Sequence, residues 1–190
     1  SLVNILLMVL LIVAVISQLG VETTSFAALL ASAGLAVGMA LSGNLQNLAG
    51  GLLILLFRPY KVGDFIEFQA HTGKVREIQI FYTILVTPDN KVIYLPNGPL
   101  SSGAVVNYSQ EETRRVEWTV SVEYGEDYEK VERTLRELIA ADQRILADPE
   151  PVFVLMTLAA SSVDVVMRVW VPTAEYWNVY LDMNKHIYAT

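Results

Sequence analysis

The sequence contains no cysteine and only two histidines, which removes several classes of functional site at the outset. Without thiols there is neither a disulfide framework nor a thiolate metal centre. His71 and His186 lie far apart in the sequence and show no ligand spacing, so we expect no metal site and no cofactor. An excess of basic residues is missing too, and the net charge of −7 argues against a nucleic-acid partner.

Charged side chains are almost absent from the first part of the chain. Glu22 is the only ionisable side chain before Arg58, and all 13 Lys and Arg residues come after Phe57. Because charges are costly in hydrocarbon, this asymmetry indicates a membrane segment followed by a water-facing one. A cleaved signal peptide is the alternative, but the first run has no basic n-region and continues into a second apolar segment.

Two apolar runs have the length of membrane spans. Residues 2–19 contain only three polar side chains, close to the roughly 20 residues that cross a hydrocarbon core. A polar turn at residues 20–23 separates this run from a second span at residues 26–41. The sequence therefore predicts two transmembrane helices.

A half-amphipathic helix follows the second span. Gly43 stands between the two, where a missing side chain favours a bend, and an ordinary helix end capped by glycine is the alternative. Arg58 and Lys61 come directly after this helix, and by the positive-inside rule they put the remaining chain in the cytoplasm. The apolar residues at helical spacing are Leu45, Leu48, Ala49, Leu52, Leu53 and Leu56.

The chain divides into three predicted parts, and it begins and stops inside helical patterns, so we expect a fragment of a longer protein. Residues 1–57 are the transmembrane helices and the helix that continues the second span beyond Gly43. Five short strands predict a small barrel-like β domain at residues 58–108. A β-α-β-β-α order predicts a ferredoxin-like α+β domain, truncated before its last strand, at residues 109–190.

The predicted strands and helices follow the turn signals. Strands are expected at residues 64–68, 74–78, 82–87, 91–95, 104–108, 114–122, 152–157 and 163–171, and helices at 127–141 and 176–188. The predicted turns are His71-Thr72-Gly73, Pro88-Asp89-Asn90 and Pro96-Asn97-Gly98.

Small residues form two ridges on the second span. At about 100° per residue, one narrow ridge carries Ala27, Ala31, Gly34 and Gly38, and a second carries Ala33, Ala36 and Ala40. Small side chains let helices approach closely in lipid. Because the two ridges differ, identical copies of this helix can pack head to tail and close into a cyclic oligomer.

The strip between the ridges then faces the central axis of the ring. Leu35 and Met39 have its largest side chains, and a narrow apolar constriction excludes water and ions, so these two residues are the predicted gate. The alternative is a helix that only packs tightly in a membrane scaffold or transporter subunit without a pore. The strip consists of Ala28, Ser32, Leu35, Met39 and Ser42, while Leu30, Val37 and Leu41 point towards lipid or the first helix.

Several motifs in one collinear order resemble the MscS-like mechanosensitive channels. They cover nearly the whole chain, and the pore-helix signature is the most specific of them. The motifs are Gly34-Leu35-Ala36-Val37-Gly38-Met39-Ala40-Leu41, Gly43-Asn44-Leu45-Gln46-Asn47-Leu48-Ala49-Gly50-Gly51, Phe57-Arg58-Pro59-Tyr60, Val62-Gly63-Asp64, Pro96-Asn97-Gly98 and Arg168-Val169-Trp170.

The resemblance implies a homoheptamer in the inner cell membrane, in contact with lipids. Its pore helix would be broken at Gly43, closed by rings of Leu35 and Met39, and opened by membrane tension. Such a channel acts as an osmotic release valve for ions and small solutes. The two cytoplasmic domains would enclose a hollow chamber with side portals. We expect no enzyme, because acids such as Glu111 and Asp127 belong to a loop and a helix start.

Overall fold

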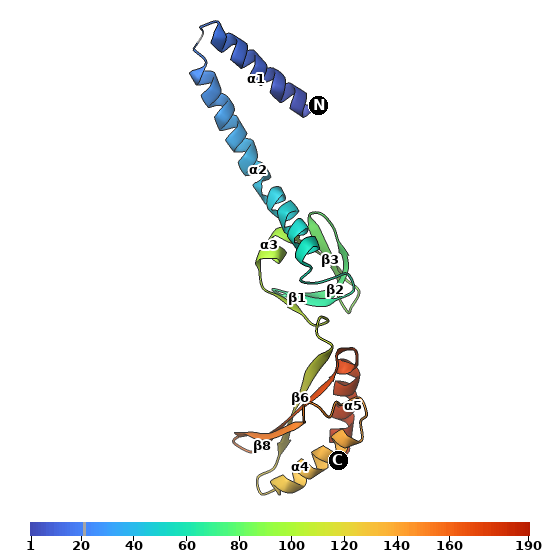
Figure 1. The fold of residues 1–190 in the computed structure, drawn as a ribbon. Helices are drawn as coiled ribbons and strands as arrows, with labels where there is room; N and C mark the ends of the chain where they lie inside the picture. The colour runs from blue at the N-terminus through green and yellow to red at the C-terminus, as the bar shows by residue number, and fades with distance from the viewer. Residues whose placement is uncertain (21) are drawn as a thin grey trace. The chain divides into compact units, whose positions relative to one another are not determined.

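The structure is a computed structural model that describes residues 1–20 and 22–190 (Figure 1). It contains two compact units. One unit holds Ser1–Pro59 and Arg76–Ala104, and the other holds Tyr60–Val75 and Val105–Thr190. The predicted turn at residues 20–23 includes Val21, which lies outside the described residues.

Two apolar helices open the chain. α1 (Leu2–Gln18) has 17 residues and α2 (Thr24–Phe57) has 34. At 1.5 Å per residue α2 is about 51 Å long, whereas α1 is about 26 Å, somewhat short of a ~30 Å hydrocarbon core. Among the described residues, α2 is the one helix that is both long and apolar enough to cross a membrane.

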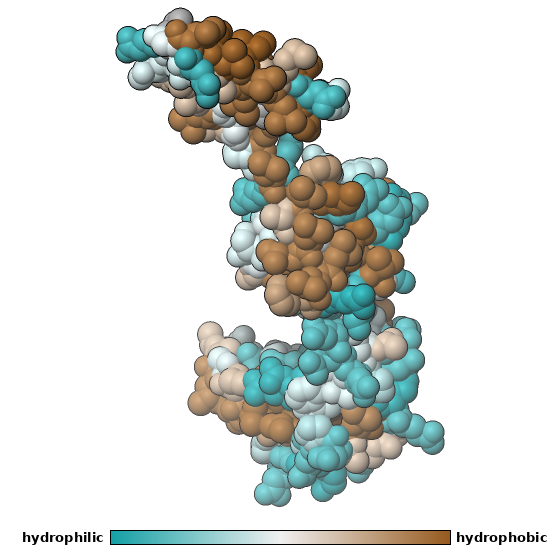
Figure 2. Space-filling model, turned by 45° about the horizontal axis from the view of Figure 1, so that its top comes forward, coloured by the Kyte–Doolittle hydropathy of each residue, from teal (hydrophilic) through white to brown (hydrophobic). Residues whose placement is uncertain are grey.

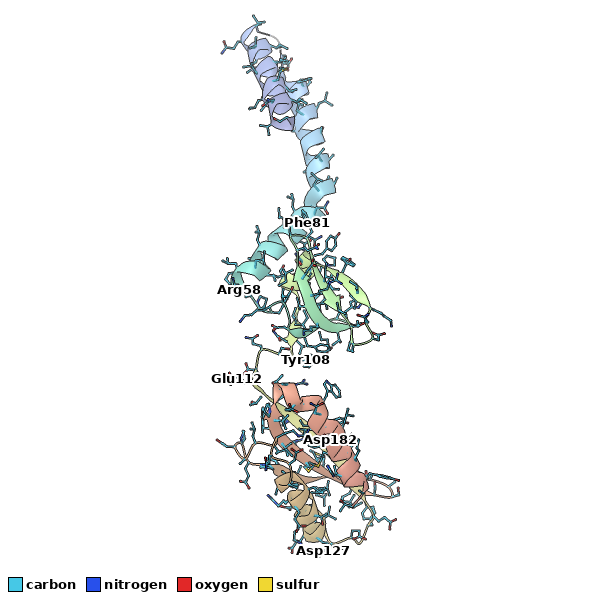
Figure 3. All side chains as sticks on the ribbon, turned by 90° about the vertical axis from the view of Figure 1, so that its right-hand side faces the viewer. Arg58, Phe81, Tyr108, Glu112, Asp127 and Asp182 are labelled. Carbon is cyan, nitrogen blue, oxygen red and sulfur yellow. The ribbon has the colours of Figure 1, made fainter. Side chains whose placement is uncertain are left out.

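α2 joins the predicted second span and the predicted half-amphipathic helix into one uninterrupted element. Gly43 lies inside it, so the alternative of a glycine cap at this position is wrong. Figure 3 shows that the ribbon of α2 changes direction along its length. The helix ends at Arg58, whose left-handed backbone (φ 50°) and N–H bond to the Ile54 carbonyl close the last turn before Pro59.

A five-stranded sheet follows α2, with the order β4-β3-β2-β1-β5. Two predicted turns are wrong here. His71-Thr72-Gly73 begins β2, because the chain already reverses at Gln69, which has a positive φ of 54°. Pro96-Asn97-Gly98 leads from β4 into the short helix α3 (Asn97–Ser102). The strands are β1 (Phe65–Phe68), β2 (His71–Ile78), β3 (Tyr82–Val86), β4 (Val92–Pro96) and β5 (Val105–Asn107).

The last part of the chain has the predicted β-α-β-β-α order. Its antiparallel sheet has the order β6-β8-β7, with strands β6 (Thr113–Val122), β7 (Val152–Leu158) and β8 (Val163–Pro172). The helices are α4 (Tyr128–Ala140), the 3-10 turn η1 (Thr173–Glu175) and α5 (Tyr176–Tyr188). Asp127 caps α4 by accepting a hydrogen bond from the Glu129 N–H. The core is formed by Val116, Trp118, Leu135, Ile139, Val165, Met167, Val169, Val171, Val179 and Met183.

Candidate functional site

The first half of α2 is apolar and exposed on every side. From Thr24 to Gln46 only Leu30 is partly covered, and the predicted gate residues Leu35 and Met39 are 64% and 63% exposed. Figure 2 shows the hydrophobic surface of the helical segment in brown. A helix that is hydrophobic all round belongs in lipid or against other helices. In the single chain this apolar surface is therefore free to contact lipid and other helices.

The glycines in the first part of α2 have nothing against them in the described chain. A Cβ added at Gly34, Gly38 or Gly43 would meet no atom within 4 Å. The ridges are therefore not used for packing inside one chain. The continuous helix keeps Leu35 and Met39 one turn apart, as their spacing predicts.

The two serines of the predicted lining turn their hydroxyl groups back to the helix. Ser32 Oγ donates a hydrogen bond to the Leu29 carbonyl at 2.9 Å, and Ser42 Oγ donates to the Met39 carbonyl at 2.8 Å. Such bonds satisfy a hydroxyl group within its own helix. The predicted lining strip is therefore more apolar than its residue types suggest.

The second half of α2 packs through a face that its leucines do not form. Gly50, Gly51 and Ile54 are buried, and Ile54 is 1% exposed. By contrast, Leu52 is 61% and Leu56 is 74% exposed. The leucine spacing correctly predicts a helix, but the surface that meets the rest of the chain consists mainly of glycine backbone.

Asn97 organises the surface that receives this helix. Its side chain is fully buried, and Nδ2 donates hydrogen bonds to the carbonyls of Gln79 at 2.8 Å and Ile80 at 3.1 Å. Oδ1 accepts a hydrogen bond from Thr83 Oγ1 at 2.8 Å. The sequence pattern predicts only a turn at Asn97. The available signal was the Gly50-Gly51 pair, because adjacent glycines inside a helix indicate close backbone approach.

The backbones of α2 and of this surface touch directly. A Cβ at Gly50 would lie 2.4 Å from the Asn97 carbonyl oxygen, and one at Gly51 would lie 2.2 Å from the Ile80 carbonyl oxygen. Gly98 N–H donates a hydrogen bond to Asn47 Oδ1 at 2.9 Å. We call Asn47, Gly50, Gly51 and Ile54 together with Ile80, Asn97 and Gly98 the docking seat of α2.

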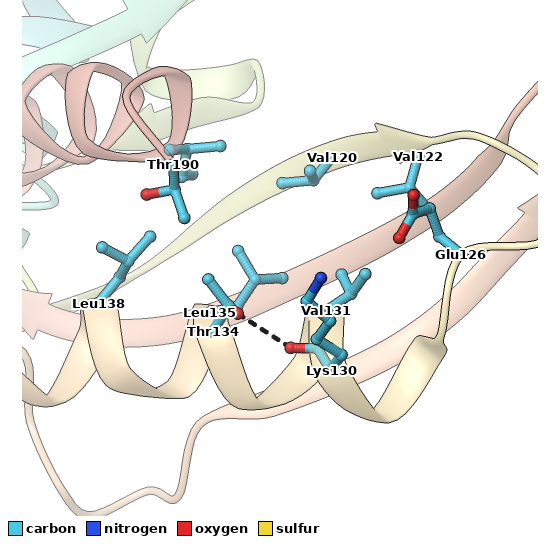
Figure 4. Close-up of a pocket in the computed structure, with 10 residues that line it drawn as sticks. Val120, Val122, Glu126, Lys130, Val131, Thr134, Leu135, Leu138 and Thr190 are labelled. Carbon is cyan, nitrogen blue, oxygen red and sulfur yellow. Dashed lines mark hydrogen bonds between the residues drawn. The ribbon is translucent and has the colours of Figure 1, made fainter.

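A pocket in the last part of the chain gathers no cluster of reactive side chains. A pocket of about 230 Å³ lies between α4, β6 and the end of α5 (Figure 4). Its lining is mostly apolar, and Glu126 and Lys130 are its charged members. His71 starts β2 and His186 lies in the last turn of α5. Among residues 1–20 and 22–190, no three acidic, histidine or cysteine side chains come together as a metal site.

Comparison with known proteins places this architecture in a family. Three protein-family models match the chain in succession: "Mechanosensitive ion channel, transmembrane helices 2/3" at residues 1–42, "Mechanosensitive ion channel, beta-domain" at 43–110, and "Mechanosensitive ion channel MscS, C-terminal" at 116–189. Their order agrees with the order of the elements described above.

Individual relatives agree with these matches. The small-conductance mechanosensitive channel of Edwardsiella ictaluri is 46% identical over 155 residues, which are 82% of this chain and 54% of that protein. The channel of the same name from Helicobacter pylori is 34% identical over 167 residues, 87% of this chain and 61% of that protein. The chain thus spans little more than half the length of these relatives.

A solved structure extends the similarity to three dimensions. The crystal structure of Helicobacter pylori MscS in a closed state superimposes with a TM-score of 0.90 at 30% identity, and the match covers 98% of this chain and 74% of that one. The fold is therefore shared over 98% of this chain. The chain belongs to the MscS family of mechanosensitive ion channels.

Proposed function

We propose that this chain is the pore-lining and cytoplasmic part of a mechanosensitive channel subunit, opened by membrane tension to ions and small solutes. The observation that carries the proposal is the first half of α2, an apolar helix exposed on every side in a chain of the MscS family. Such a helix needs lipid and other helices around it. Release of solutes during osmotic stress is the role that follows, and it involves no catalysis.

The pore is lined by the strip of α2 between its two small ridges. Leu35 and Met39 form the closing rings, and their exposure in the single chain supports this role. Ala28, Ser32 and Ser42 complete the lining, with both hydroxyl groups bonded to the helix backbone. A narrow ring without available polar groups sheds water and blocks ions without a plug.

The subunits form a cyclic homo-oligomer, a heptamer, through head-to-tail packing of α2. Gly34, Gly38 and Ala31 on one copy meet Ala36 and Ala40 on the next. The open space around the glycines supports this arrangement. Lipids cover the outer face of the ring in the inner cell membrane.

The chain has three domains in this proposal. Residues 1–57 contain two spans and a pore helix kinked at Gly43, residues 58–108 form a barrel-like β domain, and residues 109–190 form a ferredoxin-like domain. The change of direction in α2 supports the kinked pore helix. The strand order β6-β8-β7 supports the ferredoxin-like domain. Arg58 and Lys61 put the last two domains in the cytoplasm.

Patch recording of the full-length protein in liposomes under stepped suction tests the proposal. Openings should be reversible and suction-dependent, and Leu35→Ser should shift them to lower pressure because the shorter side chain widens the apolar ring. Leu41→Ser is the matched control, since Leu41 lies on the opposite side of α2 and should leave the threshold nearly unchanged.

The same recording separates the channel from a scaffold or transporter subunit. A protein that assembles but stays silent up to membrane rupture contradicts the channel function. An equal response of Leu35→Ser and Leu41→Ser contradicts the assigned lining while leaving the channel function intact.

A further inference from the structure

Arg114 lies between two tyrosine rings that come from different parts of the chain. Its guanidinium carbon is 3.8 Å from the ring centroid of Tyr176 and 4.9 Å from that of Tyr108. Tyr176 begins α5, whereas Tyr108 directly follows β5 of the β domain. A flat cation between two aromatic faces is held by both of them.

Each tyrosine is also held by contacts within its own domain. On the β-domain side, Tyr108 OH donates a hydrogen bond to Glu67 Oε2 at 2.5 Å, and the Tyr108 N–H donates to the Phe65 carbonyl at 2.9 Å. Both of these acceptors belong to β1. The tyrosine is therefore part of the sheet edge formed by β1 and β5 rather than of a free loop.

On the other side, Tyr176 belongs to an aromatic cluster on the core of the α+β domain. Its ring stacks on Tyr180 with centroids 6.5 Å apart, and Tyr180 stacks on Trp118 with centroids 5.9 Å apart. Trp118 is buried in that core. A continuous series of contacts thus runs from β1 through Arg114 to the centre of the α+β domain.

A second set of contacts holds residues 109–112, the segment that leads to Arg114. Thr173 Oγ1 donates a hydrogen bond to the Glu111 carbonyl at 2.6 Å, and the Thr173 N–H donates to the Glu112 carbonyl at 2.8 Å. At its start, Ser109 Oγ accepts a hydrogen bond from the Phe65 N–H at 2.9 Å. Tyr108 and Glu112 near the two ends of the segment are labelled in Figure 3.

A short polar connection such as residues 109–112 ordinarily lets two domains move independently. We propose that Arg114, clamped by Tyr108 and Tyr176, is a joint that prevents this motion and makes the β1–β5 edge and the α+β domain one rigid body. The compact unit formed by residues 60–75 and 105–190 agrees with this joint. The joint is independent of whether the channel opens under tension.

Hydrogen exchange of the full-length protein in lipid nanodiscs tests the joint. In Arg114→Ala, the amides of residues 109–113 and of Thr173 should exchange about five to ten times faster than in the parent protein, because the clamp no longer opposes local opening. Exchange in β8 and in β6 from Val116 onwards should not change, which shows that the domain is still folded.

Arg115→Ala is the matched control, since it removes the same charge from the next residue, whose side chain is 53% exposed. Its exchange should resemble the parent protein. Arg114→Lys should resemble Arg114→Ala, because an ammonium group lacks the flat face that stacks. Equal exchange in Arg114→Ala and Arg115→Ala overturns the joint, as does a parent-like Arg114→Lys.

Substitutions of the partner ring keep the test decisive if Arg114→Ala fails to fold. Tyr176→Phe retains the ring and should behave like the parent protein. Tyr176→Leu removes the aromatic face and should accelerate exchange in residues 109–113 to the level expected for Arg114→Ala. The same exchange rate in both Tyr176 variants contradicts the proposal.

Discussion

Asn47 Oδ1 accepts a hydrogen bond from the backbone N–H of Gly98 across 51 residues of sequence. This bond lies beside Gly50 and Gly51, where the backbone of α2 touches the backbone around Ile80 and Asn97. Contacts between backbones leave little room for adjustment. Single substitutions in the docking seat should consequently shift the second half of α2.

Asn47→Ala should loosen the docking seat. It deprives the Gly98 N–H of its acceptor, and Gly98 is buried, so we expect a cost of about 1–2 kcal/mol. Faster hydrogen exchange at α3 in the full-length protein measures this loss. Asn44→Ala, an exposed position on the same helix, is the control, and equal exchange in both variants contradicts the role of Asn47.

Gly51→Ala should displace α2 from its seat. The new methyl group would lie 2.2 Å from the Ile80 carbonyl oxygen, a backbone atom in the connection between β2 and β3, so we expect a loss of about 1–3 kcal/mol. Gly43→Ala has open space and better helix propensity, which predicts a gain of about 0.5–1 kcal/mol. Thermal unfolding of both variants should therefore shift in opposite directions, and a common direction contradicts this account.

Asn97→Ala should be among the most destabilising changes in this unit. The carbonyls of Gln79 and Ile80 lose their donor in a partly buried place, at a cost of about 1–3 kcal/mol for the two groups together. Asn184→Ala, at an exposed position of α5, serves as the control. If thermal unfolding gives the two variants the same midpoint, the organising role of Asn97 is wrong.

The ion pair between Asp142 and Arg144 should make stability depend on pH on the acid side. Arg144 donates hydrogen bonds to Asp142 and lowers the pKa of this carboxyl group below its ordinary value of 3.8. A carboxyl group with a lowered folded-state pKa stabilises the fold above its ordinary pKa, and the effect is lost as the pH falls through the folded-state pKa.

Arg144→Gln should consequently lose less stability than the parent protein when the pH falls from about 5 to about 3. Urea unfolding followed by tryptophan fluorescence at several pH values measures the difference. Arg133→Gln, at an exposed position of α4, should keep the parent pH dependence. Parallel pH curves for the parent and Arg144→Gln contradict the prediction.

Periodicity was sufficient for the elements that carry side chains into a core. The predicted helix at residues 176–188 has the same bounds in the structure, and the helix predicted at 127–141 differs by one residue at each end. Both helices pack apolar side chains against β6 and β8, so their apolar spacing reports directly on the contact. A sequence pattern identifies such elements because burial and apolarity coincide.

In the second half of α2 the apolar spacing predicts the helix but does not identify the face that packs, for a physical reason. The buried surface there consists of Gly50 and Gly51, which have no side chain to count, while Leu52 and Leu56 are exposed. In a helix that continues a membrane span, apolar side chains need not face the protein core. The partner Asn97 follows 46 residues after Gly51, and no local pattern links the two.

The hydroxyl groups of Ser32 and Ser42 are bonded to the backbone of their own helix, which limits what the proposed pore can respond to. No side chain between Thr23 and Phe57 titrates, and the hydroxyl groups of the lining are already bonded, so neither acidity nor ionic strength has a group to act on there. Whether water enters would be decided by the width of the passage alone. A barrier of this kind responds to a mechanical stretch and ignores the chemistry of the solution that it holds back.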